Sequence, residues 1–494
     1  MLKPLSKERW NYTTAAHLLN RAGFGGTPKE IEHLVNLGPD KAVSYLVDYE
    51  NIPGHSPNPE WAKPDPSRLD RFMEARKADP QKRQELLREE QRTQRQRIVE
   101  LKHWWLNRMA KGSRPLQEKM TLFWHGHFAT SAEKVRDAYL MWKQNDLFRQ
   151  HAVGNWSKML VAVAKDPAML IWLDQAQSRK EHPNENFARE VMELFTLGEG
   201  HYTEKDITEA ARALTGWTYD RLNQQFEERP RFHDDGTKTV LGRTGNLTGE
   251  DVLEQIVAQP QAARFITTKL WNFFASETPS DELVTALADA FRKSGNNFKP
   301  LLAAMFHSEE FYANSVIRNQ VKSPVQWLVG TVRVLERELP PPLVCFGLTR
   351  NLGQDLFQPP NVKGWDGGLS WITTNNLLAR YNEAAVLVQG DLSMAKGVNL
   401  NLGNGGAGAG KVIAERLQNL KLRPVDIARI LSEDEQKDKQ KLLAALEKRL
   451  LQAKLRGKQQ ETLKQYLDSQ PGLDDAVILN TVRLMMSTPE YQLT

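Results

Sequence analysis

The chain has 494 residues, of which 40% are hydrophobic and 26% charged, a composition typical of a globular, soluble protein with two or three subdomains. The formal net charge of +5 is small for this length and gives no reason to expect nucleic-acid binding. The single cysteine, Cys345, excludes an internal disulfide.

The N-terminal sequence lacks the apolar core and small-residue cleavage site of a secretory signal, so we expect a cytoplasmic protein as the sequence stands. If a signal peptide was removed, a periplasmic or secreted location becomes the expectation. No run of about 18 apolar residues occurs anywhere, and we therefore expect no membrane span.

Helical signals begin near the N-terminus with a complete short helix. Thr27 is placed as its N-cap, Pro28 occupies the first helical position, and Glu30 completes a capping box. Gly38 and Pro39 are expected to end it.

A long charged helix is predicted over residues 80–111. Its apolar end contains Ile98, Leu101, Trp104 and Trp105. Charge runs of this kind are usually solvated, so most of this helix is expected to face water.

Three further amphipathic helices are predicted in the middle of the chain, over 203–217, 278–295 and 299–312. The first has Thr203 as its N-cap and Asp206 three residues later, which again predicts a capping box.

One β signal interrupts the helices. Residues 228–246 place Asp235 and Gly236 between β-prone flanks, which predicts a small hairpin. Residues 340–375 are rich in proline and glycine and are expected to be irregular.

The expected fold is therefore all-α, a multi-helical body with one small β-hairpin and a helical C-terminal extension. We place the body at 1–390, a glycine-rich linker at 391–411 and the C-terminal helical region at 412–494.

The stretch 184–203 has the densest group of charges. At about 100° per residue, Glu185, Arg189, Glu190 and Glu193 share one polar half of a helix. One interpretation is a solvated surface on which Arg189 pairs with Glu185 and Glu193. The other is an active site, in which one arginine shared by three carboxylates leaves them with unequal pKa values.

Two histidines, His125 and His127, flank Gly126. In one helix they would point about 160° apart, whereas in an extended or broken segment they could hold one metal ion. Gly126 makes a helix break plausible. The alternative is two hydrogen-bonded histidines among aromatic residues.

Three more groups of polar and aromatic side chains are candidates. They are His17 with Arg21, one helical turn apart; His233, Asp234 and Lys238 at the hairpin; and Lys363, Trp365 and Asp366 in the irregular segment. Local packing or turn chemistry would also explain each group.

Several stretches occur together in an order that is similar to a large bacterial family, domain of unknown function 1800. They are HLLNRAGFG, FWHGHFAT, NENFAREVMELFTLGEGHYTEKDI, FHDDGTKTVLG, RFITTKLWNFF, KSPVQWLVG, GQDLFQPPNVKGW and LMMSTPEYQ. The resemblance covers roughly residues 13–390 and the C-terminal end. It implies a bacterial, mostly helical protein, but it implies no reaction.

The resemblance also implies a frequent genomic neighbour similar to the alkaline phosphatase and sulfatase superfamily. It further implies that polar residues are retained in the family at the positions of His17, Arg21, His125, His127, Glu185, Arg189, Glu190, Glu193, His233, Asp234 and Lys238. A solvated surface has little need for such particular residue types, which favours a polar cleft.

Our leading hypothesis is a hydrolase that acts on a polysaccharide or oligosaccharide. Glycoside hydrolysis uses two carboxylates about 5–10 Å apart that flank the bond, so Glu185 or Glu190 could pair with Asp234 or Asp366. The catalytic candidates are Glu185, Glu190, Glu193 and Asp234. The candidates for substrate binding are His17, Arg21, Trp124, His125, His127, Arg189, His233, Lys238, Lys363, Trp365 and Asp366, with tryptophans stacking on sugar rings.

Two alternatives stay open. A metal-dependent enzyme would use His125, His127 and one or two glutamates as ligands, so a metal ion is the one cofactor considered. A non-catalytic scaffold would instead dock a phosphatase-like or sulfatase-like protein through the charged helices at 80–111 and 413–467.

Overall fold

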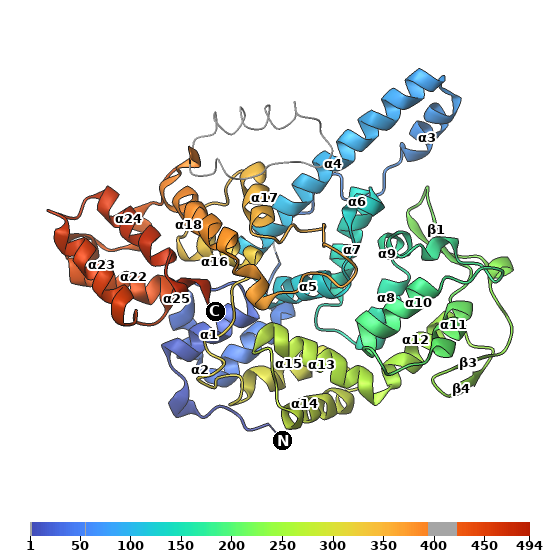
Figure 1. The fold of residues 1–494 in the computed structure, drawn as a ribbon, viewed down its shortest axis with the longest axis horizontal. Coiled ribbons are helices and arrows are strands. Elements are labelled where there is room, and N and C mark those ends of the chain that lie inside the picture. The colour runs from blue at the N-terminus through green and yellow to red at the C-terminus, as the bar shows by residue number, and fades with distance from the viewer. Residues whose placement is uncertain (1, 55, 394–421) are drawn as a thin grey trace.

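The computed structural model describes residues 2–54, 56–393 and 422–494 (Figure 1). Helices dominate these residues, and two small antiparallel sheets of two strands each accompany them. The predicted all-α fold with a small hairpin is therefore confirmed. Within the described part of the chain, no helix is long and apolar enough to cross a membrane.

The helices of the first half of the chain are α1 Tyr12–Ala22, α2 Pro28–Val47, α3 Arg68–Lys77, α4 Pro80–Lys111, α5 Pro115–His127, α6 Ala132–Val135, α7 Ala138–Gln150, α8 Trp156–Ala164, α9 Pro167–Trp172, α10 Glu185–Glu190, the π-helix η4 Val191–Thr196 and α11 Glu204–Ala213. The strands are β1 Trp217–Asp220, β2 Gln225–Glu228, β3 Lys238–Val240 and β4 Arg243–Gly245.

The later helices are α12 Gly249–Ala258, α13 Pro260–Phe274, α14 Asp281–Lys293, α15 Phe298–His307, α16 Pro324–Val334, α17 Pro342–Asn351 and α18 Thr374–Gln389. After the undescribed residues come α20 Ile427–Ile430, α21 Glu433–Lys437, α22 Lys439–Leu446, the π-helix η8 Glu447–Leu451, α23 Gly457–Ser469, α24 Asp475–Met486 and α25 Pro489–Gln492.

The predicted starts of two helices, which rest on capping boxes, are confirmed. Thr27 and Glu30 form the capping box of α2, and Thr203 and Asp206 form that of α11. Gly38 has a positive φ of 78° and interrupts α2, but helical structure resumes immediately after it. Gly38 and Pro39 therefore bend α2 where we expected it to end.

The sheets correct the position of the predicted turn. In the β3–β4 hairpin the turn is Leu241–Gly242, and both residues have positive φ values, which the tight turns of two-residue hairpins require. The Asp235–Gly236 pair precedes β3. A second hairpin, β1–β2, was not predicted.

Two hydrophobic clusters form the core. The first joins α1, α2, α5 and α8 with α10 to α15, and it is centred on stacked aromatic rings such as Trp124 and Trp156, 5.7 Å apart. The second joins α4, α16, α17 and α18 to the C-terminal helices, through side chains such as Leu101, Trp327 and Met485. The division at 390 and 412 stays a prediction, and residues 394–411 of the expected linker lie outside the described residues.

The long helix α4 begins outside the body of the protein. Figure 1 shows its N-terminal half projecting with α3 beside it, while its C-terminal half runs into the body. Leu69, Phe72 and Met73 on α3 and Leu87 on α4 are exposed on this two-helix arm. The arm is therefore apolar in part, although most of its residues are charged or polar.

Candidate functional site

The charged stretch 184–203 does not form one uniform α-helix. It begins as α10 and continues as the π-helix η4, in which the Leu197 amide reaches back to the carbonyl of Met192 over 2.8 Å. π-Helical turns are rare and occur often at functional sites. The extra residue per turn also changes the angular spacing, so the face predicted for Glu193 at 100° per residue does not hold.

Arg189 has a different partner from the two we predicted. Its guanidinium donates two hydrogen bonds, of 2.8 and 2.6 Å, to Glu204 on α11, and neither Glu185 nor Glu193 pairs with it. Glu185 in turn accepts a hydrogen bond of 3.0 Å from Thr208 on α11. Arg189 and Glu185 therefore connect α10 to α11. In the described structure, Glu190 and Glu193, the other two candidate carboxylates of this stretch, make no such contact with α11.

Glu190 and Glu193 lie in different surroundings. Glu193 accepts a hydrogen bond of 2.7 Å from the Tyr202 hydroxyl. Glu190 is half-buried, and in the described ranges no hydrogen bond or ion pair reaches it. Burial and then the charge of Glu193 raise the pKa of Glu190 above its ordinary value, while Arg189 opposes them. An unequal carboxylate pair of this kind is the arrangement that acid–base chemistry uses.

Asp234 is held by an arginine. Arg212 of α11 donates hydrogen bonds of 2.7 and 3.1 Å to the two Asp234 oxygens, and this contact lowers the pKa of Asp234. His233 bonds through Nδ1 to the carbonyl of Thr215, and Lys238 donates to the carbonyl of Gly236, each over 3.0 Å. This group fixes the segment before β3 against α11 and leaves Asp234 a poor proton donor.

The two histidines do not share a metal site. Gly126 does not break α5, and the ring nitrogens bind different backbones: His125 Nε2 accepts from the Phe357 amide, and His127 Nε2 contacts the Phe195 carbonyl, each over 3.0 Å. Burial lowers both pKa values, that of His125 to about 3.

Among the residues that the structure describes, no group of three or more His, Cys, Asp and Glu side chains could hold a metal ion. The ligand set of the metal-dependent alternative is therefore not brought together.

Three residues proposed for substrate binding lie in the core. Trp124 is fully buried, and its indole donates to the carbonyl of Ala152. His17 and Arg21 are also buried, and the Arg21 guanidinium bonds to Gln320, Asn319 and the carbonyl of Val316. These placements correct the expectation that the three side chains meet a bound polymer.

The irregular segment after α17 lies against α5. A Cβ on Gly364 would stand 2.4 Å from the carbonyl oxygen of Gly126, so the two backbones touch. Trp365 is partly buried, with its ring 5.6 Å from that of His125. Lys363 and Asp366 are 71% and 78% exposed and stand 4.0 Å apart. Both are therefore accessible to a ligand.

Sequence reasoning missed two buried lysines near these motifs. Lys269 on α13 donates to the carbonyl of Leu194 in η4, and burial, with the charge of Lys363, lowers its pKa to about 8. Lys119 on α5 lies between the rings of Phe24 and Phe273, and burial, with the charge of Arg21, lowers its pKa to about 7. A lysine on the apolar face of an amphipathic helix is the signal that could have found both.

The fold and the site define a mostly helical protein with two unequal carboxylates, Glu190 at the end of α10 and Glu193 on the π-helix η4. The family model described as Protein of unknown function (DUF1800) matches residues 17–493, and the chain belongs to this family. This result confirms the resemblance drawn from the motifs. Neither a curated protein nor a solved structure was found to match the chain.

Proposed function

We propose that the protein is a hydrolase that acts on a carbohydrate polymer, with Glu190 as the proton donor and Glu193 as the neighbouring carboxylate that favours the protonated form of Glu190. The proposal rests on the surroundings and the pKa of Glu190. It is half-buried, it has no polar partner among the described residues, and its pKa is raised. A carboxyl group with a raised pKa keeps its proton to higher pH than an ordinary carboxyl group, and in its protonated form it can protonate the leaving oxygen of a glycosidic bond.

Glu193 and Tyr202 support the role of Glu190 as a proton donor. The hydroxyl of Tyr202 holds one Glu193 oxygen at 2.7 Å, which orients the carboxylate. The negative charge of Glu193 also favours the protonated form of Glu190, because two adjacent carboxylates resist being ionised together.

The two glutamates come from one helical turn, whereas a glycosidase needs carboxyl groups that flank the bond. The irregular segment supplies a candidate for the opposite side. The positive charge of Lys363 helps to lower the pKa of Lys269, and the Lys269 amine donates a hydrogen bond to the Leu194 carbonyl in η4. The segment that carries Lys363 and Asp366 therefore lies near the π-helix. Exposed Asp366 is therefore our candidate for the carboxylate across a bound sugar chain.

The test is release of new reducing ends from a panel of polysaccharides by the pure protein. Glu190→Gln should lower the rate about 10²–10⁴-fold, the usual contribution of a general acid, without lowering Tm. Glu185→Gln is the matched control, because the Glu185 carboxylate accepts a hydrogen bond from Thr208 on α11 and this variant should leave the rate nearly unchanged. Absence of turnover on every polymer, or equal rates for the two variants, would refute the proposal.

The exposed arm favours a second candidate function, a scaffold for a partner protein. Leu69 and Phe72, one helical turn apart on α3, are 50% and 57% exposed, and Leu87 on α4 is 52% exposed. Neighbouring exposed apolar side chains often mark an interaction surface. The proposed partner is a phosphatase-like or sulfatase-like protein, because the family resemblance implies a genomic neighbour of that kind. Phe72→Ser should weaken copurification with such a protein while Glu190→Gln leaves it intact, and the reverse result would argue against a scaffold.

A further inference from the structure

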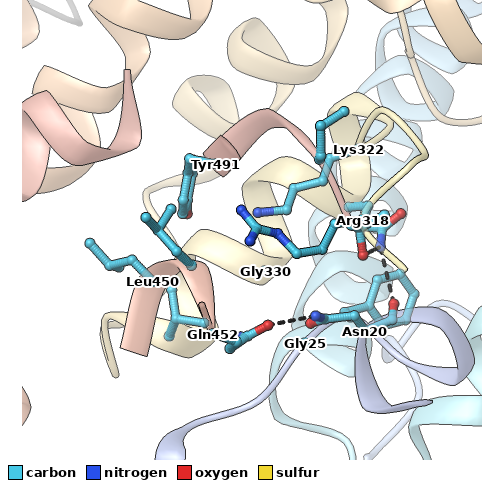
Figure 2. Close-up of a pocket in the computed structure, with 14 residues that line it drawn as sticks. Asn20, Gly25, Arg318, Lys322, Gly330, Leu450, Gln452 and Tyr491 are labelled. Atoms are coloured by element: carbon cyan, nitrogen blue, oxygen red, sulfur yellow. Dashed lines mark hydrogen bonds between the residues drawn. The ribbon is translucent and has the colours of Figure 1, made fainter. Parts of the chain in front are cut away.

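A small pocket lies where the N-terminal helix α1, the helix α16 and the C-terminal helices meet. Its walls include Asn20, Arg318, Lys322, Gly330, Leu450 and Tyr491 (Figure 2). The enclosed space measures about 20 Å³. One water molecule needs about 10–15 Å³ on the same measure, so the pocket can hold a single small group.

Two cations point into this space. Figure 2 shows the Lys322 amine and the Arg318 guanidinium close to one another on the side that faces Tyr491 and Leu450. Burial, followed by the charges of Arg380 and Arg318, lowers the pKa of Lys322 to about 7. Burial and the charge of Arg456 lower the pKa of Arg318, and Glu490 only partly opposes them.

Neither cation has a polar partner of its own. Over residues 2–54, 56–393 and 422–494, no hydrogen bond or ion pair reaches the Lys322 amine or the Arg318 guanidinium. The amine lies 3.9 Å from the centre of the Tyr491 ring, which covers one side of it. Arg318 also has a left-handed φ of 59°, a conformation that costs a non-glycine residue energy and that packing here maintains.

Several other polar groups of the pocket already have hydrogen-bond partners. Asn20 donates to Gln452 over 2.6 Å, Gln326 donates to the carbonyl of Asn20 over 3.1 Å, and the Tyr491 hydroxyl shares a hydrogen bond of 2.7 Å with Thr331. Among the described residues, Arg318 and Lys322 are therefore the cationic side chains of the pocket that are left without a hydrogen-bond or ion-pair partner. A ligand that fits must accept hydrogen bonds and carry negative charge.

We propose that this pocket binds a small anion of the size of chloride or of one carboxylate group, held by Arg318 and Lys322. The anion removes the repulsion between two close cations that have no counterion within ion-pairing distance. Because the walls come from α1, α16 and the C-terminal helices, the anion also joins these three parts of the chain. The site is separate from the proposed catalytic turn, and it does not depend on hydrolysis.

The test measures thermal unfolding of the full chain in a buffer whose only anion is a bulky organic sulfonate. Added sodium chloride or sodium formate should raise Tm by about 2–5 °C at a hundredfold excess over Kd, beyond the effect of the sulfonate at equal ionic strength. Line broadening in chloride NMR of the same protein provides a second readout that does not depend on unfolding.

Arg318→Met and Lys322→Met should each lose the anion-dependent rise in Tm and the chloride broadening. Both variants should be at least as stable as the unchanged protein when small anions are absent, because each removes one of the repelling charges. Lys82→Met, on the exposed arm, is the control that should keep the full response. Equal responses in all four proteins would overturn the proposal, and so would stabilisation by phosphate in the absence of any effect of chloride and formate.

Discussion

Tyr202 donates a hydrogen bond of 2.7 Å to Glu193, and it thereby distinguishes Glu193 from its neighbour Glu190 on the same helical turn. Glu190 is half-buried beside that negative charge and has no polar partner of its own in the described residues. Two side chains of the same type therefore have different surroundings: Glu193 meets a hydroxyl group, whereas burial and the charge of Glu193 raise the pKa of Glu190.

The raised pKa of Glu190 makes the pH profile of any hydrolysis a direct test. A proton donor acts only while it is protonated, so kcat should fall as the pH rises through the raised pKa of Glu190. Glu193→Gln removes the negative charge that helps to raise this pKa, and the alkaline limb should then move to lower pH. If the limb of the Glu193→Gln variant keeps its position, Glu190 is not the group that titrates.

A second prediction concerns Glu118, a buried carboxylate on α5. It accepts hydrogen bonds from Arg149, Arg108 and the Trp105 indole at 2.8 to 3.1 Å. Burial alone would raise the pKa of Glu118, but Arg149 and then Arg108 lower it below the ordinary value. Glu118→Gln leaves Arg108 without its counterion and Arg149 with only Asp146, 3.5 Å away, and it should reduce the free energy of unfolding by about 3–5 kcal/mol.

Urea denaturation measures this loss of unfolding free energy. Repeating it at several pH values shows whether the contribution of Glu118 grows or shrinks as the pH falls. A carboxylate with a lowered pKa in the folded state contributes stability above its unfolded pKa and loses it as the pH falls. The difference between the native protein and Glu118→Gln should therefore shrink on acidification. Glu85→Gln, which removes an exposed pair with Lys82 at 3.6 Å, should change the unfolding free energy by less than about 1 kcal/mol.

Lys119 leads to a prediction in which the substitution should stabilise the protein, whereas that of Glu118 should destabilise it. Its pKa of about 7 lies below the ordinary value for lysine, so above pH 7 the unfolded chain binds more protons than the folded chain. Stability should therefore rise with pH between about 7 and 10, by up to about 1.4 kcal/mol per pH unit from this group. Lys119→Met should be more stable than the native protein at pH 7 and should show a flatter rise.

Denaturation at several pH values tests this prediction, with Lys441→Met as the control because Lys441 is exposed beside Asp434. A Lys119→Met variant that is less stable at pH 7 would mean that the amine is charged and has a partner. The result would also bear on Arg21, whose positive charge contributes to the lowered pKa of Lys119.

The sequence predicted those parts of the fold that depend on neighbours along the chain. The capping boxes at Thr27 and Thr203 were found because a cap and its partner are three residues apart. The charged helix 80–111 has the predicted bounds, because Pro80 can begin a helix and Gly112 follows its end.

The site was predicted less well, because its partners come from other elements. Arg189 has acidic residues one turn away on both sides, but Glu204 on α11 approaches with better geometry. The π-helix was missed because periodicity analysis assumes one angle per residue, and an i to i+5 hydrogen bond leaves no clear trace in composition. The Arg318–Lys322 pocket joins residues that are more than a hundred positions from Leu450, so spacing could not reveal it.

The contact between Gly364 and Gly126 leads to the last prediction. Gly364 has a φ of 88°, and a Cβ there would lie 2.4 Å from the Gly126 carbonyl oxygen, a backbone atom that cannot move aside easily. Gly364→Ala should therefore reduce the free energy of unfolding by about 2 kcal/mol or more, from the strain of a positive φ together with the clash. It should also displace the segment that carries Lys363 and Asp366.

Gly126→Ala is the matched control on the other side of the same contact. A Cβ on Gly126 would meet nothing within 4 Å, and alanine is favoured over glycine inside a helix by about 1 kcal/mol. This variant should therefore be as stable as the native protein or slightly more stable. If both variants lose the same stability in thermal denaturation, the segment does not lie against α5 in this way.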